Sequence, residues 1–181
     1  LDDKFGRWIP VESMNVARTN ATATLLDDGI VLVAGGEANS GVPLNSAEIF
    51  DPETGKWQLV GSMASPHAVH TATLLPDGTV VIIGGLQRIP GKAAGTSTTV
   101  EIFDPESGEW FDGPPLTNDE ANDDPGRILH DAVLVRGTHI LVVGGVNTDG
   151  VQFHSLQSVP LLDTNVMKWM FTEASNSRRQ S

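Results

Sequence analysis

The chain has 181 residues, 39% of them hydrophobic and 19% charged, which lies within the globular range and predicts a folded domain or part of a larger one. Its formal net charge of −12 disfavours a nucleic acid or an anionic membrane surface as partner. The absence of cysteine excludes disulfides, thiol catalysis and zinc–thiolate sites, and no apolar run approaches the ~20 residues of a membrane span.

The first predicted element is a single outer strand within residues 1–14. Its sequence DDKFGRWIPVESM, around Trp8, matches DPETGKWQLVGSM around Trp57, so it repeats the end of a later structural unit. The earlier strands of such a unit are not found among residues 1–14. We therefore expect residues 1–14 to form the outer strand of a preceding structural unit.

Three internal repeats follow, at residues 15–63, 64–116 and 117–174. Each contains two strand-like runs joined by a tight turn, and a Gly-Gly pair follows the second run. These segments are ATATLLDDGIVLVAGG, HTATLLPDGTVVIIGG and HDAVLVRGTHILVVGG. Two more strands come from SAEIFDPETGKW and TVEIFDPESGEW, while the third copy, VPLLDTNVMKW, is degenerate. Residues 175–181 are predicted to form a disordered polar tail.

The second repeat shows the expected strands most clearly, at residues 71–75, 80–83 and 99–103, with a fourth at Trp110. The continuously apolar run 80–83 is typical of a strand buried on both faces. Because successive strands are antiparallel, short turns should lie at one end of each unit and long connections at the other. Long loops on a rigid scaffold are where binding usually occurs. The long connections are residues 37–45, 86–98, 117–126 and 146–157.

The Gly-Gly pairs, the Glu-Ile-Phe-Asp-Pro segments and the regularly spaced tryptophans resemble the kelch repeat, whose period is ~50 residues. The resemblance implies an all-β fold of kelch-type β-propeller blades: three four-stranded blades plus one extra outer strand, in a partial or self-assembled propeller. The amino-acid sequence of the repeats is most similar to that of microbial secreted or surface kelch proteins, which are fold relatives of galactose-oxidase-like propellers. An extracellular or cell-surface location is therefore expected.

A structural role is predicted for the glycine pairs and the tryptophans. A double glycine lets a bulky neighbour approach the backbone, and we expect the tryptophans to fill that space between blades. These residues are Gly35, Gly36, Gly84, Gly85, Gly144, Gly145, Trp8, Trp57, Trp110 and Trp169.

Three blades cannot close a propeller, which typically has four to eight. The sequence leaves two explanations open: further blades of a longer parent chain, or a homodimer that completes a six-bladed ring.

Basic and imidazole side chains recur where the first strand of each repeat begins. Such groups converging on a propeller axis could bind an anion such as a carboxylate. Alternatively, they hydrogen-bond the backbone of neighbouring blades, or the histidines hold a metal ion. The candidate binding residues are Arg18, His67 and Arg127 and, three positions further on, His70 and His130.

The most acidic segment lies between the second and third repeats. Its oxygen-rich side chains are of the kind that Ca²⁺ prefers, although it fits no calcium-loop signature and most acidic loops are merely solvated. The candidate ligands are Asp119, Glu120, Asp123 and Asp124. No other cofactor is predicted.

These observations favour a binding module for a protein or a glycan over an enzyme. The alternatives are a purely structural repeat and a portion of a carbohydrate-acting kelch enzyme completed by missing blades. Kelch-type copper radical oxidases, which this chain resembles in fold, need tyrosine and cysteine, and the chain has neither. A sialic-acid-isomerase-like enzyme would use Arg18, Arg127, His70 and His130, the charged residues at the channel mouth.

Overall fold

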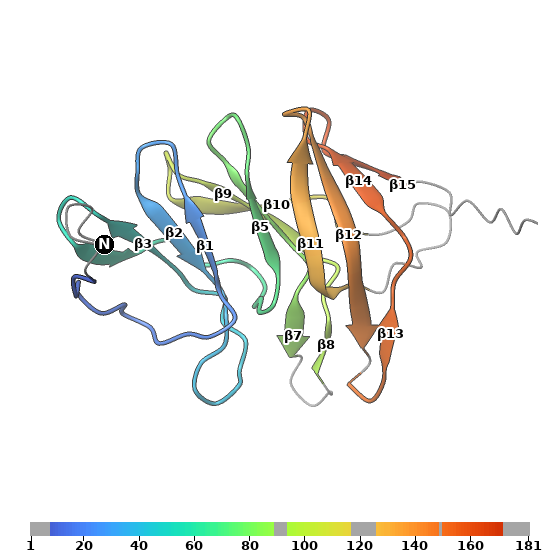
Figure 1. The fold of residues 1–181 in the computed structure, drawn as a ribbon, viewed down its shortest axis with the longest axis horizontal. Coiled ribbons are helices and arrows are strands. Elements are labelled where there is room, and N and C mark those ends of the chain that lie inside the picture. Colours follow the sequence, from blue (N-terminus) through green and yellow to red (C-terminus); the bar gives the residue numbers. More distant parts are fainter. Residues whose placement is uncertain (1–7, 89–93, 117–125, 149, 172–181) are drawn as a thin grey trace, which may run out of the picture.

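A computed structural model describes residues 8–88, 94–116, 126–148 and 150–171, and these contain fifteen strands and no helix. Consequently none of the described residues form a helix that could cross a membrane. Three antiparallel sheets, two of four strands and one of five, stand side by side (Figure 1), which confirms the predicted all-β architecture of successive blades. The acidic segment 119–124 and the tail 175–181 lie outside the described residues.

Each blade uses its strands in chain order, from an inner to an outer strand. Blade 1 contains β1 (Thr22–Leu25), β2 (Val31–Ala34), β3 (Ala47–Asp51) and β4 (Lys56–Leu59). Blade 2 contains β5 (Thr71–Leu74), β6 (Val80–Ile83), β9 (Val100–Asp104) and β10 (Glu109–Asp112). Blade 3 contains β11 (Ile128–Val135), β12 (His139–Thr148), β14 (Pro160–Asp163) and β15 (Lys168–Phe171).

Two connections between second and third strands form hairpins of their own. In blade 2, β7 (Leu86–Arg88) pairs with β8 (Ala94–Thr96), and in blade 3, β13 (Phe153–Ser155) pairs with the end of β12. Figure 1 shows β7, β8, β13 and the long connection of blade 1 at the lower side of the molecule, with the turns between first and second strands at the upper side. We call these the loop face and the turn face.

Apolar packing between blades forms the core, in two layers that we call the first and second seams. The first seam, between blades 1 and 2, buries Leu32, Ala34, Val80, Ile82 and Phe103, among others. The second, between blades 2 and 3, buries Val81, Ile83, Ile140, Val142 and Leu162, among others.

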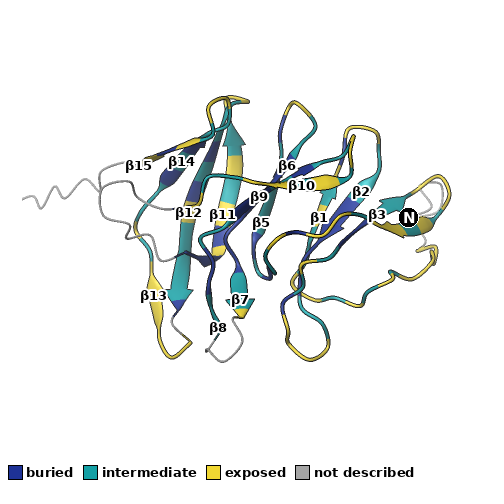
Figure 2. Cartoon of the chain, turned by 180° about the vertical axis from the view of Figure 1, so that it is seen from behind, coloured by how far each residue is buried: buried dark blue, intermediate teal, exposed yellow. Residues whose placement is uncertain are grey.

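The strand β6 contributes to both seams. Because its side chains alternate between the faces of the sheet, Val80 and Ile82 face blade 1 while Val81 and Ile83 face blade 3. All four residues are 0% exposed, and Figure 2 shows β6 as buried. The predicted strand at residues 80–83 is thus confirmed as buried on both faces.

Histidine rings, not tryptophans, lie in the space beside Gly35 and Gly84, so the expectation that tryptophans fill this space was wrong. A Cβ added to Gly35 would lie 2.8 Å from Cε1 of His70, and one added to Gly84 would lie 3.2 Å from Cε1 of His130. Both glycines also have positive φ, +62° and +64°, which disfavours any other residue. Gly35 and Gly84 therefore allow the next blade to approach closely at the inner edge of each seam.

The tryptophans instead tie the outer strands of adjacent blades. The indole N–H of Trp110 donates to the carbonyl of Gly61, and that of Trp169 donates to the carbonyl of Pro114, at 2.8 and 2.9 Å. Each acceptor lies just beyond the outer strand of the preceding blade. The tryptophans bridge blades as expected, but at the outer edge rather than beside the glycines.

The described part of the predicted N-terminal outer strand, residues 8–14, is not a β-strand. It nevertheless forms the same hydrogen bond as the segments that follow the outer strands of blades 1 and 2, because the carbonyl of Glu12 accepts the indole N–H of Trp57 at 2.9 Å. Trp8 itself is 88% exposed. Residues 8–14 thus lack a neighbouring strand but retain the position that the repeat assigns to them.

Candidate functional site

The inner strands meet where the predicted basic and imidazole residues lie, and Arg18 is the first of them. Its guanidinium donates to the carbonyls of Gly35 and Ser46 at 2.7 and 2.9 Å. It also forms a 2.7 Å ion pair with Glu48, whose side chain is fully buried. Arg18 therefore ties the second and third strands of its own blade together.

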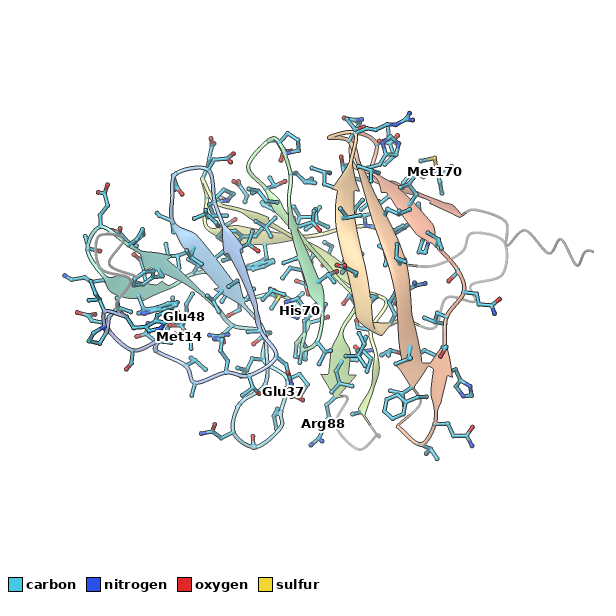
Figure 3. All side chains as sticks on the ribbon, viewed as in Figure 1. Met14, Glu37, Glu48, His70, Arg88 and Met170 are labelled. Atoms are coloured by element: carbon cyan, nitrogen blue, oxygen red, sulfur yellow. The ribbon has the colours of Figure 1, made fainter. Side chains whose placement is uncertain are left out.

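Glu48 gathers further donors around the same point. Its carboxylate accepts hydrogen bonds from the backbone N–H groups of Asn15 and Val16 and from the side chain of Asn15. Burial raises the pKa of Glu48, but Arg18 and these hydrogen bonds outweigh burial and hold the pKa below its ordinary value. In Figure 3, Glu48 lies beside the N-terminal segment that carries Met14.

His67 repeats this arrangement in blade 2. Its Nδ1 faces the carbonyl of Gly84 at 2.6 Å and its Nε2 faces Glu101 at 3.0 Å. Glu101 also accepts from the backbone N–H groups of Ala64 and Ser65. Burial raises the pKa of Glu101, but His67 and the two backbone donors lower it by more. The pKa therefore lies below its ordinary value, and the carboxylate is ionised at neutral pH.

In blade 3 the same position is Arg127, which is 0% exposed. It donates to the carbonyl of Gly144 at 3.0 Å and to the hydroxyl of Ser158 at 2.8 Å. Pro160 occupies the position that corresponds to Glu48 and Glu101, so blade 3 has no carboxylate there.

The second set, His70 and His130, lies across the seams. Nε2 of His70 is 2.8 Å from Oγ1 of Thr22 in blade 1, and Nε2 of His130 is 3.0 Å from Oγ1 of Thr71 in blade 2. Burial, aided by the charges of His67 and His130, lowers the pKa of His70 to about 3. Burial and the charge of Arg127 lower that of His130 to about 4. Both imidazoles are thus neutral at pH 7.

His67, His70, Arg127 and His130 therefore lie at the seams and Arg18 lies within blade 1, and the hydrogen bonds of all five side chains run within the protein. The bonds differ from the expected alternative, since the side chains at positions 18, 67 and 127 bond their own blade, while His70 and His130 bond threonine hydroxyls of the preceding blade. Among the described residues, no group of three or more histidines and acids could hold a metal ion. Anion binding by these five residues stays a prediction.

Sequence reasoning missed Glu48 and Glu101, which are as deeply buried as the apolar core. The signal was present in SAEIF and TVEIF, where an acidic residue recurs inside an otherwise apolar strand. A buried carboxylate must be paired or hydrogen-bonded, so its recurrence in two repeats indicates an internal partner at the same place in each.

The loop face carries exposed side chains of a different kind. Val42, Val151 and Phe153 are 43%, 80% and 68% exposed, and Arg88 is exposed near them along the same face. In Figure 3, Glu37 and Arg88 lie on this side and Met170 lies on the opposite one. Figure 2 shows β13 as exposed along its length. This face therefore offers apolar and polar contacts to a partner.

The turn face is acidic for a local reason. Its aspartates accept backbone N–H bonds from residues two positions further along the chain, which closes the turns. The side-chain hydroxyls of Thr54 and Ser107 also donate to Asp51 and Asp104, and together with these backbone bonds they hold the pKa values of both carboxyls below their usual range. The acids of the turn face thus have a structural purpose. They are Asp28, Asp51, Asp77, Asp104 and Asp163.

Comparison with known families agrees with the geometry of the blades. The model of the kelch motif matches residues 17–64 and 68–117, which together are more than half of the chain. The chain belongs to the kelch-repeat family. Kelch repeats are commonly protein-interaction modules. Blade 3 lies outside the two matches, yet its degenerate sequence still forms four strands.

One solved structure with a similar fold is described as the structure of YjhT. It has a TM-score of 0.70 and 16% sequence identity, over 94% of this chain and 56% of that chain. This chain therefore spans a little over half the length of YjhT, and at this identity the likeness concerns the fold alone. No curated protein matches the chain in sequence.

Proposed function

We propose that this kelch chain is a recognition module whose loop face binds a protein or a glycan. The observation that carries the proposal is the contrast between the buried candidate residues and the exposed side chains of the loop face. The candidate residues at the seams use their hydrogen bonds inside the protein, whereas the loop face leaves Val42, Phe153 and Arg88 exposed.

The chemistry of the loop face suits both kinds of ligand. An exposed aromatic ring such as Phe153 offers a flat apolar surface for a sugar ring or an apolar side chain. Arg88 supplies N–H donors in a planar group that recognises carboxylates, which occur on acidic peptides and acidic sugars alike. The rigid blades beneath would limit the entropy lost on binding.

The test begins with the labelled chain on a glycan array and a peptide array. Any ligand found is then titrated against Phe153→Ala and Arg88→Ala on the loop face, with Val166→Ala, 68% exposed in the turn between β14 and β15, as the matched control. We expect each loop-face change to weaken binding by about tenfold or more and the control to leave it unchanged.

A ligand whose affinity is lost in Val166→Ala but kept in both loop-face variants would contradict the proposed face. Failure of every glycan and peptide to bind would contradict the recognition function for both ligand classes.

A further inference from the structure

The two seams are built from the same set of contacts, which makes a third one recognisable. In the first seam, the backbone N–H of Gly36 donates to the carbonyl of His67 at 2.8 Å. In the second, that of Gly85 donates to the carbonyl of Arg127 at 2.8 Å. Each seam thus joins the second glycine of one blade to the start of the next blade's inner strand.

An imidazole completes each seam. The ring of the incoming histidine lies over the first glycine of the pair and bonds a threonine hydroxyl directly opposite the residue that precedes this glycine. In the first seam these partners are Gly35 and Thr22, and in the second they are Gly84 and Thr71. The incoming blade therefore supplies a ring nitrogen that hydrogen-bonds the hydroxyl, and a flat ring, at one defined place.

Blade 3 presents the same surface on its far side. Asp131 occupies the position of Thr22 and Thr71, and it pairs with Val143 as Thr71 pairs with Ile83. Val143 is 45% exposed although Ile83 is 0% exposed. A Cβ added to Gly144 would meet nothing within 4 Å, in contrast to Gly35 and Gly84.

We propose that this outer face of blade 3, formed by Asp131, Val133, Val143 and Gly144, is a docking surface for a further kelch-type blade. That blade would carry an imidazole, or another N–H side chain, at the position of His70 and His130. The carboxylate of Asp131 would accept the N–H, and the ring would fill the space above Gly144. A charged acceptor makes this hydrogen bond stronger than its threonine counterparts.

A second copy of this chain fits the surface less well. Docked head to tail, it would place Ala21 where the imidazole is needed, and Asp131 would lose its solvation without gaining a donor. Docked about a two-fold axis, it would bring two Asp131 carboxylates together. In addition, residues 8–14 already occupy the outer-strand contact of Trp57 on blade 1.

Thiol labelling can test the proposal directly, because the chain has no native cysteine. Val143→Cys places a single thiol on the docking surface, and Val166→Cys places one on the turn face as a control. The full chain is compared with the same chain extended beyond Ser181 by a second copy of residues 64–116, which carries His70. We expect the extension to slow maleimide labelling at position 143 by about tenfold or more and to leave position 166 unchanged.

Two matched extensions isolate the imidazole. His70→Ala in the appended copy, or an appended copy of residues 15–63 with its Ala21, should restore most of the labelling rate. Equal labelling at position 143 with and without the extension would overturn the proposal. So would concentration-dependent protection in the unextended chain, which would show that a second copy binds there.

A second measurement covers the case in which the extended chain does not fold. In the unextended chain, Asp131→Ala removes the carboxylate that opposes docking of another copy. Light scattering should then show self-association at concentrations where the unchanged chain is monomeric. Identical masses for the two proteins would contradict the role given to Asp131.

Discussion

Glycine pairs stand where the backbone of one blade touches the inner strand of the next. Gly84 is confined by the carbonyl of Arg127, 2.7 Å from the place where a Cβ would lie, and by the ring of His130. Gly144 has the same conformation but open space beside it. Glycine is thus required at Gly84 for two reasons, its left-handed backbone and the close approach of the next blade. At Gly144 only the left-handed backbone applies.

Comparing Gly84→Ala with Gly144→Ala separates these two needs. Their φ angles, +64° and +68°, are nearly equal, so the backbone strain of alanine cancels in the comparison. We expect Gly84→Ala to lose more free energy of unfolding than Gly144→Ala, by roughly 1–3 kcal/mol from overpacking. Urea unfolding of both variants measures the difference. Equal losses would mean that the seam does not press on Gly84.

His70 should make the protein sensitive to acid. Its pKa is about 3 in the folded state and 6.5 when unperturbed, so the unfolded chain binds the proton first as pH falls. Stability from this group is therefore present above pH 6.5 and declines progressively below it, down to about pH 3. The variant His70→Gln, which can still bond Thr22, should lose less stability between pH 7 and pH 4. Parallel unfolding curves with the same pH dependence would show that His70 is not buried in solution.

At the scale of the strand, the alternation of β6 and the Asp-Gly turns could be predicted because they depend on local pattern alone. Residues 80–83 are apolar without interruption, and the Asp77-Gly78 turn follows from glycine's positive φ of +87°. The partners of His70 and Glu48 could not be predicted. Their bonds cross 48 and up to 33 residues of sequence, and the pairing depends on how one blade sits on the next.

The outer strands depend on tryptophans that differ sharply in environment. Trp169 is 7% exposed and donates its N–H across the second seam, whereas Trp8 is 88% exposed. We expect Trp169→Ala to cost ~3–5 kcal/mol and Trp8→Ala to cost under ~0.5 kcal/mol. Thermal or denaturant unfolding of the two variants provides the measurement. A comparable loss in Trp8→Ala would mean that residues 8–14 pack more deeply than the structure shows.

At the scale of the whole molecule, three blades in series make the central blade different from the other two. Blade 2 is covered on both faces, and its strand β6 is 0% exposed throughout. Blade 3 leaves Val133 and Val143 exposed on its far side. In arrays whose units contact only their neighbours, stability is shared through the interfaces, so a unit with two interfaces should open least often.

Hydrogen exchange followed by mass spectrometry tests this arrangement most directly. We predict that amides in β5, β6 and β9 exchange most slowly, and that those in β11, β12 and β14 exchange faster by at least about tenfold. Equal protection of blades 2 and 3, or greater protection of blade 3, would contradict the serial stack of blades with an open outer face.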